Sequence, residues 1–162
     1  MVVKADAEPA ESQLGMVKAN VTHGAVVVQS SDGNTYRLSW GEDRGISEDG
    51  LRALPAGEYS IRGYRLTKKD KKGKPWHFSV SGAAIGKFTL EPGKVHELAI
   101  DDRVYLANTA ARKKGKINAC VGFRGANRAG ATLYKGDERV MIQCSLKTVD
   151  GKKVDQAAAE FG

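Results

Sequence analysis

The chain has 162 residues, 41% of them hydrophobic and 28% charged, which is enough to bury a core as one domain or two small ones. The absence of any apolar run of about 18 residues excludes a transmembrane helix, and the composition excludes a chain that is disordered throughout. A formal net charge of +7 favours nucleic acid, acidic polysaccharide or an anionic membrane surface as partner, but it also serves solubility alone.

The first 15 residues are polar, rich in Ala and Glu and without periodicity, so residues 1–15 are expected to form a flexible tail. They lack the apolar segment of a signal peptide. However, Ala5-Asp6-Ala7 fits the small residues that precede a signal cleavage site. Two interpretations stay open: an ordinary tail, or the end of an export signal.

Short apolar runs separated by turn sequences follow the tail. The run Val26–Val28 and the alternating Tyr36, Leu38 and Trp40 flank Asp32-Gly33, a pair typical of a hairpin turn. The next segment, Gly41–Tyr59, predicts a loop with acidic residues in its first half and one helical turn around Ser47–Leu51.

The stretch Leu-Pro-Ala-Gly-Glu-Tyr at residues 54–59 predicts a turn that starts a strand. Pro55 fixes φ, Gly57 can take a positive φ, and Tyr59 then packs its ring inward with its hydroxyl near the rim. Further along this strand, Gly63 marks a bulge after which the apolar positions Tyr64 and Leu66 change face.

A basic hairpin tip follows at residues 67–75, and Trp76, Phe78 and Val80 then share the inward face of the next strand. A further hairpin is expected to turn at Glu91–Lys94.

Asp101-Asp102 marks a boundary between two parts of the chain, here called the seam. After it, short apolar runs separated by turn sequences resume. Strands are expected at 104–110, 117–123, 131–134 and 140–146, followed by a last strand, with turns at "RKKGK" and Gly136-Asp137. About eleven short strands and no amphipathic helix indicate an all-β protein, an Ig-like or transthyretin-like antiparallel β-sandwich or two small sandwiches in tandem. We expect a sandwich domain at 16–101, with 102–162 as a second β-sheet unit or a continuation of the same sandwich.

The residues around the Pro-Gly turn resemble a known family. Leu54, Pro55, Gly57 and Tyr59, with the later Phe88, Leu90, Pro92, Gly93 and Leu98, are similar to the carboxypeptidase regulatory-like, or transthyretin-like, β-sandwich modules, including the PEGA type. The resemblance covers residues 20–100, with the later set looking like the module's closing hairpin. It implies an accessory, envelope-associated or adhesive module without catalytic residues.

Cys120 and Cys144 leave a disulfide open. An even cysteine count favours a bridge in a secreted chain. Against it, Cys120 lies on the face opposite the apolar residues of its strand, whereas Cys144 shares the apolar face of its own strand. If both apolar faces point inward, the two thiols point to opposite sides.

Signatures of catalysis and metal binding are absent from the sequence. His23, His77 and His96 have no His or Cys at metal-ligand spacing, and neither a Gly-x-Ser-x-Gly nor a P-loop occurs. The acidic loop residues Glu42, Asp43, Glu48 and Asp49 offer oxygen ligands for Ca²⁺, but their spacing is not that of an EF-hand. We therefore expect no catalytic residue, no metal and no cofactor.

Two lysine-rich tips are the candidate binding residues. The first basic tip comprises Lys68, Lys69, Lys71, Lys72 and Lys74, and the second comprises Arg112, Lys113, Lys114 and Lys116. Lysine and arginine neutralise phosphate or sulfate groups, yet lysines are also common in solvated turns.

These observations lead us to expect a non-enzymatic structural or ligand-binding accessory module, secreted or in the cell envelope, with a cytoplasmic location still open. Its partner is expected to be an unidentified protein or a polysaccharide. The alternative is a module that binds polyanions or carbohydrates through the basic tips. Nucleic acid ranks lower as a partner, and a small hydrolase ranks third among the functions.

Overall fold

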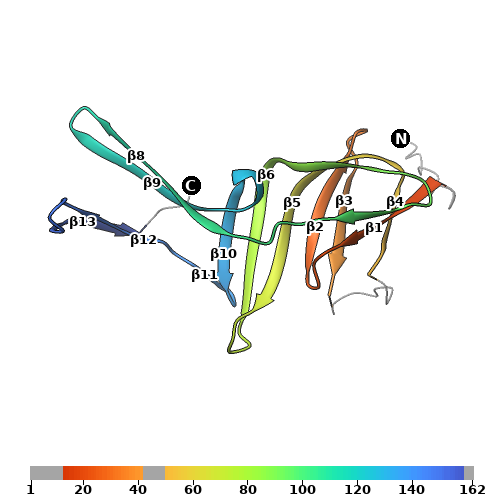
Figure 1. Ribbon diagram of the computed structural model, residues 1–162, viewed down its shortest axis with the longest axis horizontal. Helices are drawn as coiled ribbons and strands as arrows, with labels where there is room; N and C mark the ends of the chain where they lie inside the picture. Colours follow the sequence, from red (N-terminus) through yellow and green to blue (C-terminus); the bar gives the residue numbers. More distant parts are fainter. Residues whose placement is uncertain (1–12, 42–49, 159–162) are drawn as a thin grey trace, which may run out of the picture. The chain divides into compact units, whose positions relative to one another are not determined.

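The computed structural model describes residues 13–41 and 50–158, and in them the chain is all-β (Figure 1). Most strand pairs are antiparallel, as the sequence predicts, and the described residues include one short 3-10 helix, η2 (Ala126–Arg128). The strands are β1 (Leu14–Ala19), β2 (Gly24–Ser30), β3 (Thr35–Trp40), β4 (Arg52–Pro55), β5 (Gly57–Lys69), β6 (Pro75–Leu90), β7 (Val95–Leu98), β8 (Tyr105–Lys113), β9 (Lys116–Arg124), β10 (Gly130–Lys135), β11 (Glu138–Arg139), β12 (Gln143–Lys147) and β13 (Lys153–Ala158).

The chain divides into two compact units. The first takes its residues from Met1–Tyr64 and Ala84–Ile100, and the second from Arg65–Ala83 and Asp101–Gly162. The long strands β5 and β6 contribute residues to both units. The second unit thus resumes at the Asp101 seam, but it also contains residues 65–83, which lie inside the range 16–101 assigned above to the first sandwich.

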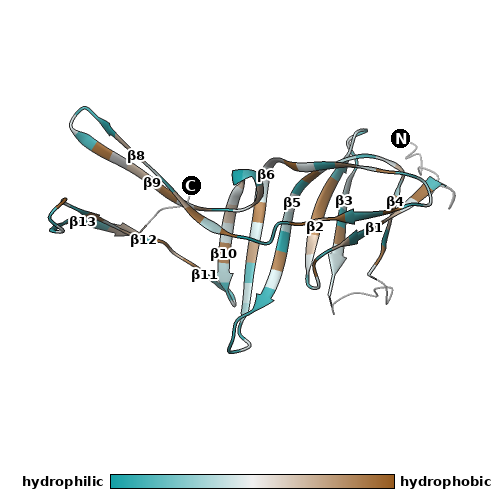
Figure 2. Ribbon diagram, in the orientation of Figure 1, coloured by the Kyte–Doolittle hydropathy of each residue, from teal (hydrophilic) through white to brown (hydrophobic). Residues whose placement is uncertain are grey.

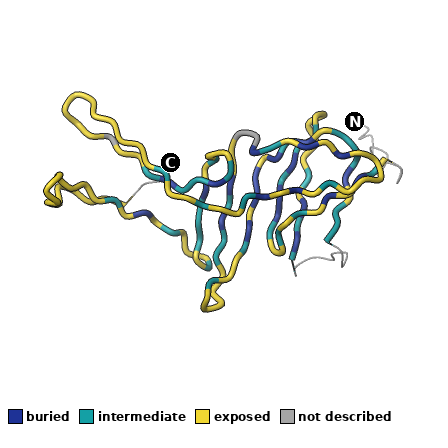
Figure 3. Tube along the Cα trace, viewed as in Figure 1, coloured by how far each residue is buried: buried dark blue, intermediate teal, exposed yellow. Residues whose placement is uncertain are grey.

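The first unit contains two sheets. One has the order β4-β1-β7, and the other has β3-β2-β5-β6; in Figure 1, β1 and β7 run across β2 and β3. The expected hairpin at Asp32-Gly33 is confirmed, because β2 pairs antiparallel with β3 from Gly24↔Trp40 to Gln29↔Thr35. Hydrophobic residues from both sheets are buried in this unit (Figures 2 and 3): Val17, Leu54 and Leu98 from the small sheet, and Val26, Val28, Leu38, Trp40, Tyr59, Ile61, Phe88 and Leu90 from the large one.

The Pro-Ala-Gly turn carries the chain from one sheet of this unit to the other. Only Ala56 separates β4, which pairs with β1, from β5, which pairs with β2, and Gly57 adopts φ +157°. The inward position predicted for Tyr59 is confirmed: 3% of the residue is exposed, and its hydroxyl donates a 2.6 Å hydrogen bond to the Pro55 carbonyl. The turn is a structural corner that starts β5.

The prediction of a hairpin that turns at Glu91–Lys94 is wrong. The turn itself forms, with Lys94 N donating to Glu91 O at 3.2 Å, but β7 does not pair with β6. Instead β7 joins the small sheet and runs parallel to β1, from Met16↔Val95 to Ala19↔Leu98. The segment is therefore another sheet-to-sheet corner, and the apolar residue Leu98 reaches the core from the opposite layer.

The first strand also begins earlier than the sequence suggested. Residues 14 and 15, assigned to the tail, belong to β1, which pairs with β4 through Leu14↔Pro55 and Gly15↔Leu54. Residues 1–12 and 42–49, which include the acidic loop and most of the expected helical turn, lie outside the described residues.

The change of face predicted within β5 is confirmed. Tyr59 and Ile61 are buried before Gly63, whereas Tyr64 and Leu66, one position out of step, are buried after it. The shift coincides with the end of the first unit's segment at Tyr64.

The second unit has the sheet order β5-β6-β10-β9-β8, with β11 paired to β10. β12 and β13 form a separate two-stranded sheet. Five of the buried hydrophobic residues belong to this unit: Leu66, Phe78, Val80, Ala131 and Ile142. Figure 3 shows β8–β9 and β12–β13 as mostly exposed.

The apolar face of the strand at 117–123 is not buried, so the condition stated above, that the apolar faces of both cysteine strands point inward, is not met here. Ile117, near the tip of the hairpin, is 50% exposed, and Leu106, near its base, is 55% exposed, because no second sheet covers these parts of the hairpin in the described residues. Both cysteines are free, with Cys120 exposed and Cys144 half-buried, so the structure contains no bridge between them.

Candidate functional site

The first basic tip is a turn organised by Asp70. Its Oδ1 accepts hydrogen bonds from the backbone N–H groups of Lys72 and Lys74 at 2.8 and 2.9 Å, and Gly73 N donates to the Asp70 carbonyl. These backbone N–H groups lower the pKa of Asp70, the Lys74 N–H most strongly. One carboxylate thus holds the turn in shape and directs its lysines outward.

Trp76 lies beside this turn and is only half-buried, whereas Phe78 and Val80 on the same strand are buried. The prediction that Trp76 belongs to the core is therefore wrong. Its indole Nε1 donates to Asp70 Oδ2 at 3.4 Å, and Lys135 Nζ stands 5.5 Å from the ring centroid in a cation–π contact. Sequence reasoning missed Lys135, because only the β6–β10 pairing Trp76↔Lys135 brings it here.

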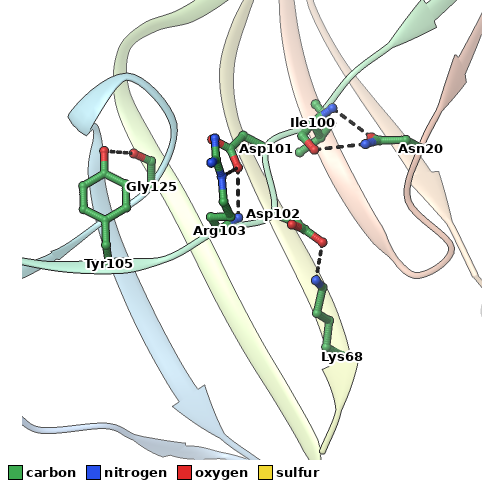
Figure 4. Close-up of polar contacts among 8 residues, drawn as sticks. All are labelled: Asn20, Lys68, Ile100, Asp101, Asp102, Arg103, Tyr105 and Gly125. Atoms are coloured by element: carbon green, nitrogen blue, oxygen red, sulfur yellow. Dashed lines mark hydrogen bonds and ion pairs between the residues drawn. The ribbon is translucent and has the colours of Figure 1, made fainter.

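Acidic residues accompany the first basic tip. Lys68 forms an ion pair with Asp102 (Figure 4). Gly136 N donates to the Pro75 carbonyl at 2.9 Å, which brings the turn bearing Asp137 and Glu138 next to the tip. The positive charge of this tip is therefore partly compensated.

The second basic tip ends a long, exposed hairpin. β8 and β9, here called the ribbon (Tyr105–Arg124), pair in an unbroken antiparallel register that closes at Lys113↔Lys116. From Asn108 to Cys120, every side chain that the structure describes is exposed. The tip residues Arg112, Lys113, Lys114 and Lys116 thus stand at the end of a two-stranded arm, as Figures 1 and 3 show.

The turn at this tip has an unusual residue in it. Lys114 has φ +49° and Gly115 has φ +76°, the pair of positive values that a two-residue type I′ turn requires. Gly meets this requirement without strain, and Asn or Asp meets it more readily than Lys does. Lysine is thus held in a backbone conformation that disfavours it.

The ribbon also lies in a segment without acidic residues. Residues 104–136, here called the acid-free segment, contain no Asp or Glu and seven basic residues: Arg112, Lys113, Lys114, Lys116, Arg124, Arg128 and Lys135. Because the chain has 26 basic residues in all, 19 remain elsewhere, and they match the 19 acidic residues. The whole formal net charge of +7 is therefore carried by this one segment.

The two tips do not form one site. β9 pairs with β10 only at Arg124↔Gly130 and Phe123↔Ala131, after which the ribbon leaves the sheet and the two tips point in different directions (Figure 1). Tyr105 fixes the base of the ribbon, where its hydroxyl donates to the Gly125 carbonyl at 2.9 Å (Figure 4).

Asp101, which opens the second segment of this unit, is bound by Arg103. The guanidinium donates from Nε to Oδ1 at 2.8 Å and from Nη2 to Oδ2 at 2.9 Å (Figure 4). These bonds, first among the causes, lower the pKa of Asp101 to about 2. Both carboxylates of the seam, Asp101 and Asp102, are thus engaged by basic side chains.

The three histidines each have a local neighbour. His23 Nδ1 lies 3.2 Å from Thr22 Oγ1, and His77 Nδ1 lies 2.9 Å from Thr67 Oγ1. The ring of His96 stacks on Phe88 with centroids 4.7 Å apart. Within residues 13–41 and 50–158, no group of three His, Cys, Asp or Glu side chains is arranged to hold a metal ion.

Comparison with known proteins gives no match: no protein-family model, curated protein or solved structure matches the chain. None of the described residues forms a helix with the length and apolar character that crossing a bilayer needs. The function is therefore argued from the surface just described.

Proposed function

We propose that this protein is a non-catalytic accessory module that binds an acidic polymer through its ribbon. The observation that carries the proposal is the acid-free segment, which accounts for the net charge of +7 and places six of its seven basic residues on the ribbon and in the segment that follows its base, with Lys135 on β10. A concentrated positive field attracts a polyanion and releases the counterions condensed on it. The resemblance to transthyretin-like accessory modules is in keeping with a binding role.

The second basic tip is the better of the two candidate sites. Its residues extend beyond the sheet on an exposed arm, and no ion pair to them is recorded among the described residues. At the first basic tip, Lys68 is paired with Asp102, and two further acidic side chains occupy the adjoining turn. We therefore assign the binding surface to the second tip.

The experiment is retention on immobilised heparin across a salt gradient. A variant with Glu at Arg112, Lys113, Lys114 and Lys116 removes the second tip. Its matched control places Glu at Lys69, Lys71, Lys72 and Lys74, so that both variants change the net charge equally. We expect the second-tip variant to elute at much lower salt than the control, because elution reports the charges that contact the polymer.

Thermal unfolding of both variants should remain close to that of the wild-type protein, since all eight positions are exposed. Equal losses of retention in the two variants would show that net charge alone is responsible. Elution of the wild-type protein at or below about 0.15 M salt, the physiological range, would reject the proposal and leave a structural module.

A further inference from the structure

We propose that the acidic polymer is a double-stranded DNA and that the ribbon lies lengthwise in its major groove. The inference rests on the proposed function, because it specifies the ligand of the same surface. It follows from the shape of the ribbon, from the positions of its charges, and from the strained residue at its tip.

The shape of the ribbon matches the groove. Nine residue pairs join β8 to β9, from Tyr105↔Arg124 to Lys113↔Lys116, and the arm is a single two-stranded layer. The major groove of B-form DNA is about 12 Å wide and admits a two-stranded β-ribbon. Small residues dominate the middle of the arm, where Ala107, Ala110, Ala111 and Ala119 keep it narrow.

The charges lie at the two ends of the arm. Between Tyr105 and Ala111 on β8, and between Ile117 and Phe123 on β9, no side chain is charged. Seven residues of strand separate the tip from the base by about 23 Å. Arg124 stands at the base, with Arg128 at the end of η2, which follows.

This distribution fits a groove better than a linear chain. A ribbon lying in a groove meets phosphates at both ends, while its uncharged middle faces the bases. Asn108 and Thr109, which point to opposite faces of β8, offer hydrogen-bonding groups there. An acidic polysaccharide laid along the arm would instead carry its charges opposite an uncharged surface.

Backbone strain supports the same assignment. Among the described residues, three that are not glycine have positive φ, namely Lys114, Asn127 and Arg128, and all lie in the acid-free segment. Two of the three are basic. Asn or Gly would be more stable at such a φ, so a basic residue there lowers the stability of the fold while it supplies a positive charge. Strained residues of this kind are found at binding sites.

The decisive variant is Lys114→Asn, because it relieves the turn and removes one charge. We expect it to raise the unfolding temperature or leave it unchanged, yet to weaken binding to a labelled 20-base-pair DNA duplex by about threefold or more. The slope of log affinity against log salt should fall by about one unit. Lys72→Asn in the first basic tip is the matched control, and we expect it to alter the affinity by less than about twofold.

Fluorescence anisotropy provides the readout, with single-stranded DNA of the same sequence, an RNA duplex and heparin as comparison ligands. We expect the DNA duplex to bind at least about tenfold more tightly than single-stranded DNA and RNA, because the major groove of A-form RNA is deep and narrow. A dye that occupies the major groove should compete with the protein.

The outcomes separate the two proposals. Binding to heparin without preference for the DNA duplex would overturn the groove assignment and leave the polymer-binding function standing. Unchanged duplex affinity in Lys114→Asn would also count against contact of the tip with the DNA phosphates. Failure of every acidic ligand would reject both proposals together.

Discussion

Tyr59 shows how one side chain can fix a connection between sheets. Its ring stacks on Phe88 with centroids 5.3 Å apart, and its hydroxyl holds the carbonyl of Pro55, the last residue of the preceding strand. The burial of the ring, first among the causes, raises the pKa of Tyr59 to about 12. The residue therefore joins apolar packing to a backbone hydrogen bond at the Pro-Gly corner.

Replacing this side chain tests both contributions. We expect Tyr59→Phe to lower the free energy of unfolding by about 1 kcal/mol through loss of the hydrogen bond to Pro55. Tyr59→Ala should cost about 3–5 kcal/mol because it also leaves a cavity. Urea unfolding measures both, with Tyr36→Phe as control, since Tyr36 is half-buried and no hydrogen bond from its hydroxyl is recorded among the described residues. A cost for Tyr59→Phe no greater than that of the control would contradict the assignment.

Alkaline titration of Tyr59 provides an independent check. Because its pKa in the folded state lies above the ordinary value of 10.0, its contribution to stability is complete below pH 10 and is lost as the pH rises towards 12. Absorbance of the phenolate should therefore show one tyrosine that ionises at about pH 12, and Tyr59→Phe should remove that step. Ionisation of all tyrosines near pH 10 would be the opposite result.

The pKa of Asp101 is shifted in the opposite direction, downward. Its pKa of about 2 lies below the ordinary value of 3.8, so the contribution of the Arg103 contact is present above about pH 4 and is lost as the pH falls through 2. A carboxyl-carbon NMR titration should give a pKa near 2 in the wild-type protein. In Arg103→Gln it should move up towards 3.8, while the pKa of Asp32, an acidic control in the first unit, stays unchanged. An unshifted Asp101 would show that the pair does not persist in solution.

At the scale of elements, the first unit depends on a close approach between β1 and the end of β6. A Cβ atom added at Gly15 would lie 2.5 Å from Leu90 Cγ and 2.6 Å from the Glu91 carbonyl oxygen. Only glycine leaves room for this contact, and the backbone there is further tied by Gly93 N donating to the Leu14 carbonyl at 2.8 Å. The sheet-to-sheet corner at Glu91–Lys94 is thus held against β1.

Gly15→Ala should destabilise the protein by about 1–3 kcal/mol, the usual range for overpacking. Gly86→Ala on β6 is the control, since its added Cβ would meet only Ile61 Cδ1, at 3.4 Å. Urea unfolding curves of the two variants provide the comparison. Equal stability of the two variants would mean that the contact between β1 and the end of β6 accommodates a Cβ atom at position 15.

At the scale of the whole molecule, apolar burial is distributed unevenly. Most of the buried hydrophobic residues belong to the first unit, whereas large apolar side chains in the second are exposed, among them Leu106, Ile117, Met141 and Val154. The ribbon and β12–β13 are held chiefly by their own backbone hydrogen bonds. Isolated hairpins of this kind are marginally stable in water.

The rate of amide hydrogen exchange should therefore differ between the buried strands of the first unit and the two exposed hairpins. We expect slow exchange for the paired amides of β2 and β5 in the first unit. We expect exchange within seconds to minutes for the ribbon and β12–β13, since local opening there exposes little additional apolar surface. If both hairpins were protected as strongly as β2, a covering surface for them would have to exist in solution.

Many local features follow from the sequence alone. The turns at Asp32-Gly33 and Gly136-Asp137, the basic tips, the shift of face at Gly63 and most strand positions depend on neighbours in the chain. Two predictions at this level were wrong: residues 52–55, placed in a loop, form β4, and the strand expected at 140–146 begins only at Gln143. Turn residues and the two-residue alternation of strands encode such features directly. The absence of acidic residues from 104 to 136 is likewise visible in the sequence.

The tertiary structure decided which partner each strand takes and which of its faces is covered. Alternation marks two faces of a strand but does not say that one is buried, so Trp76 was assigned to the core and is only half-buried, and the apolar Ile117 is exposed. The parallel pairing of β7 with β1 and the contact of Lys135 with Trp76 join residues far apart in sequence. Such contacts depend on the packing of whole sheets, which no short stretch of sequence contains.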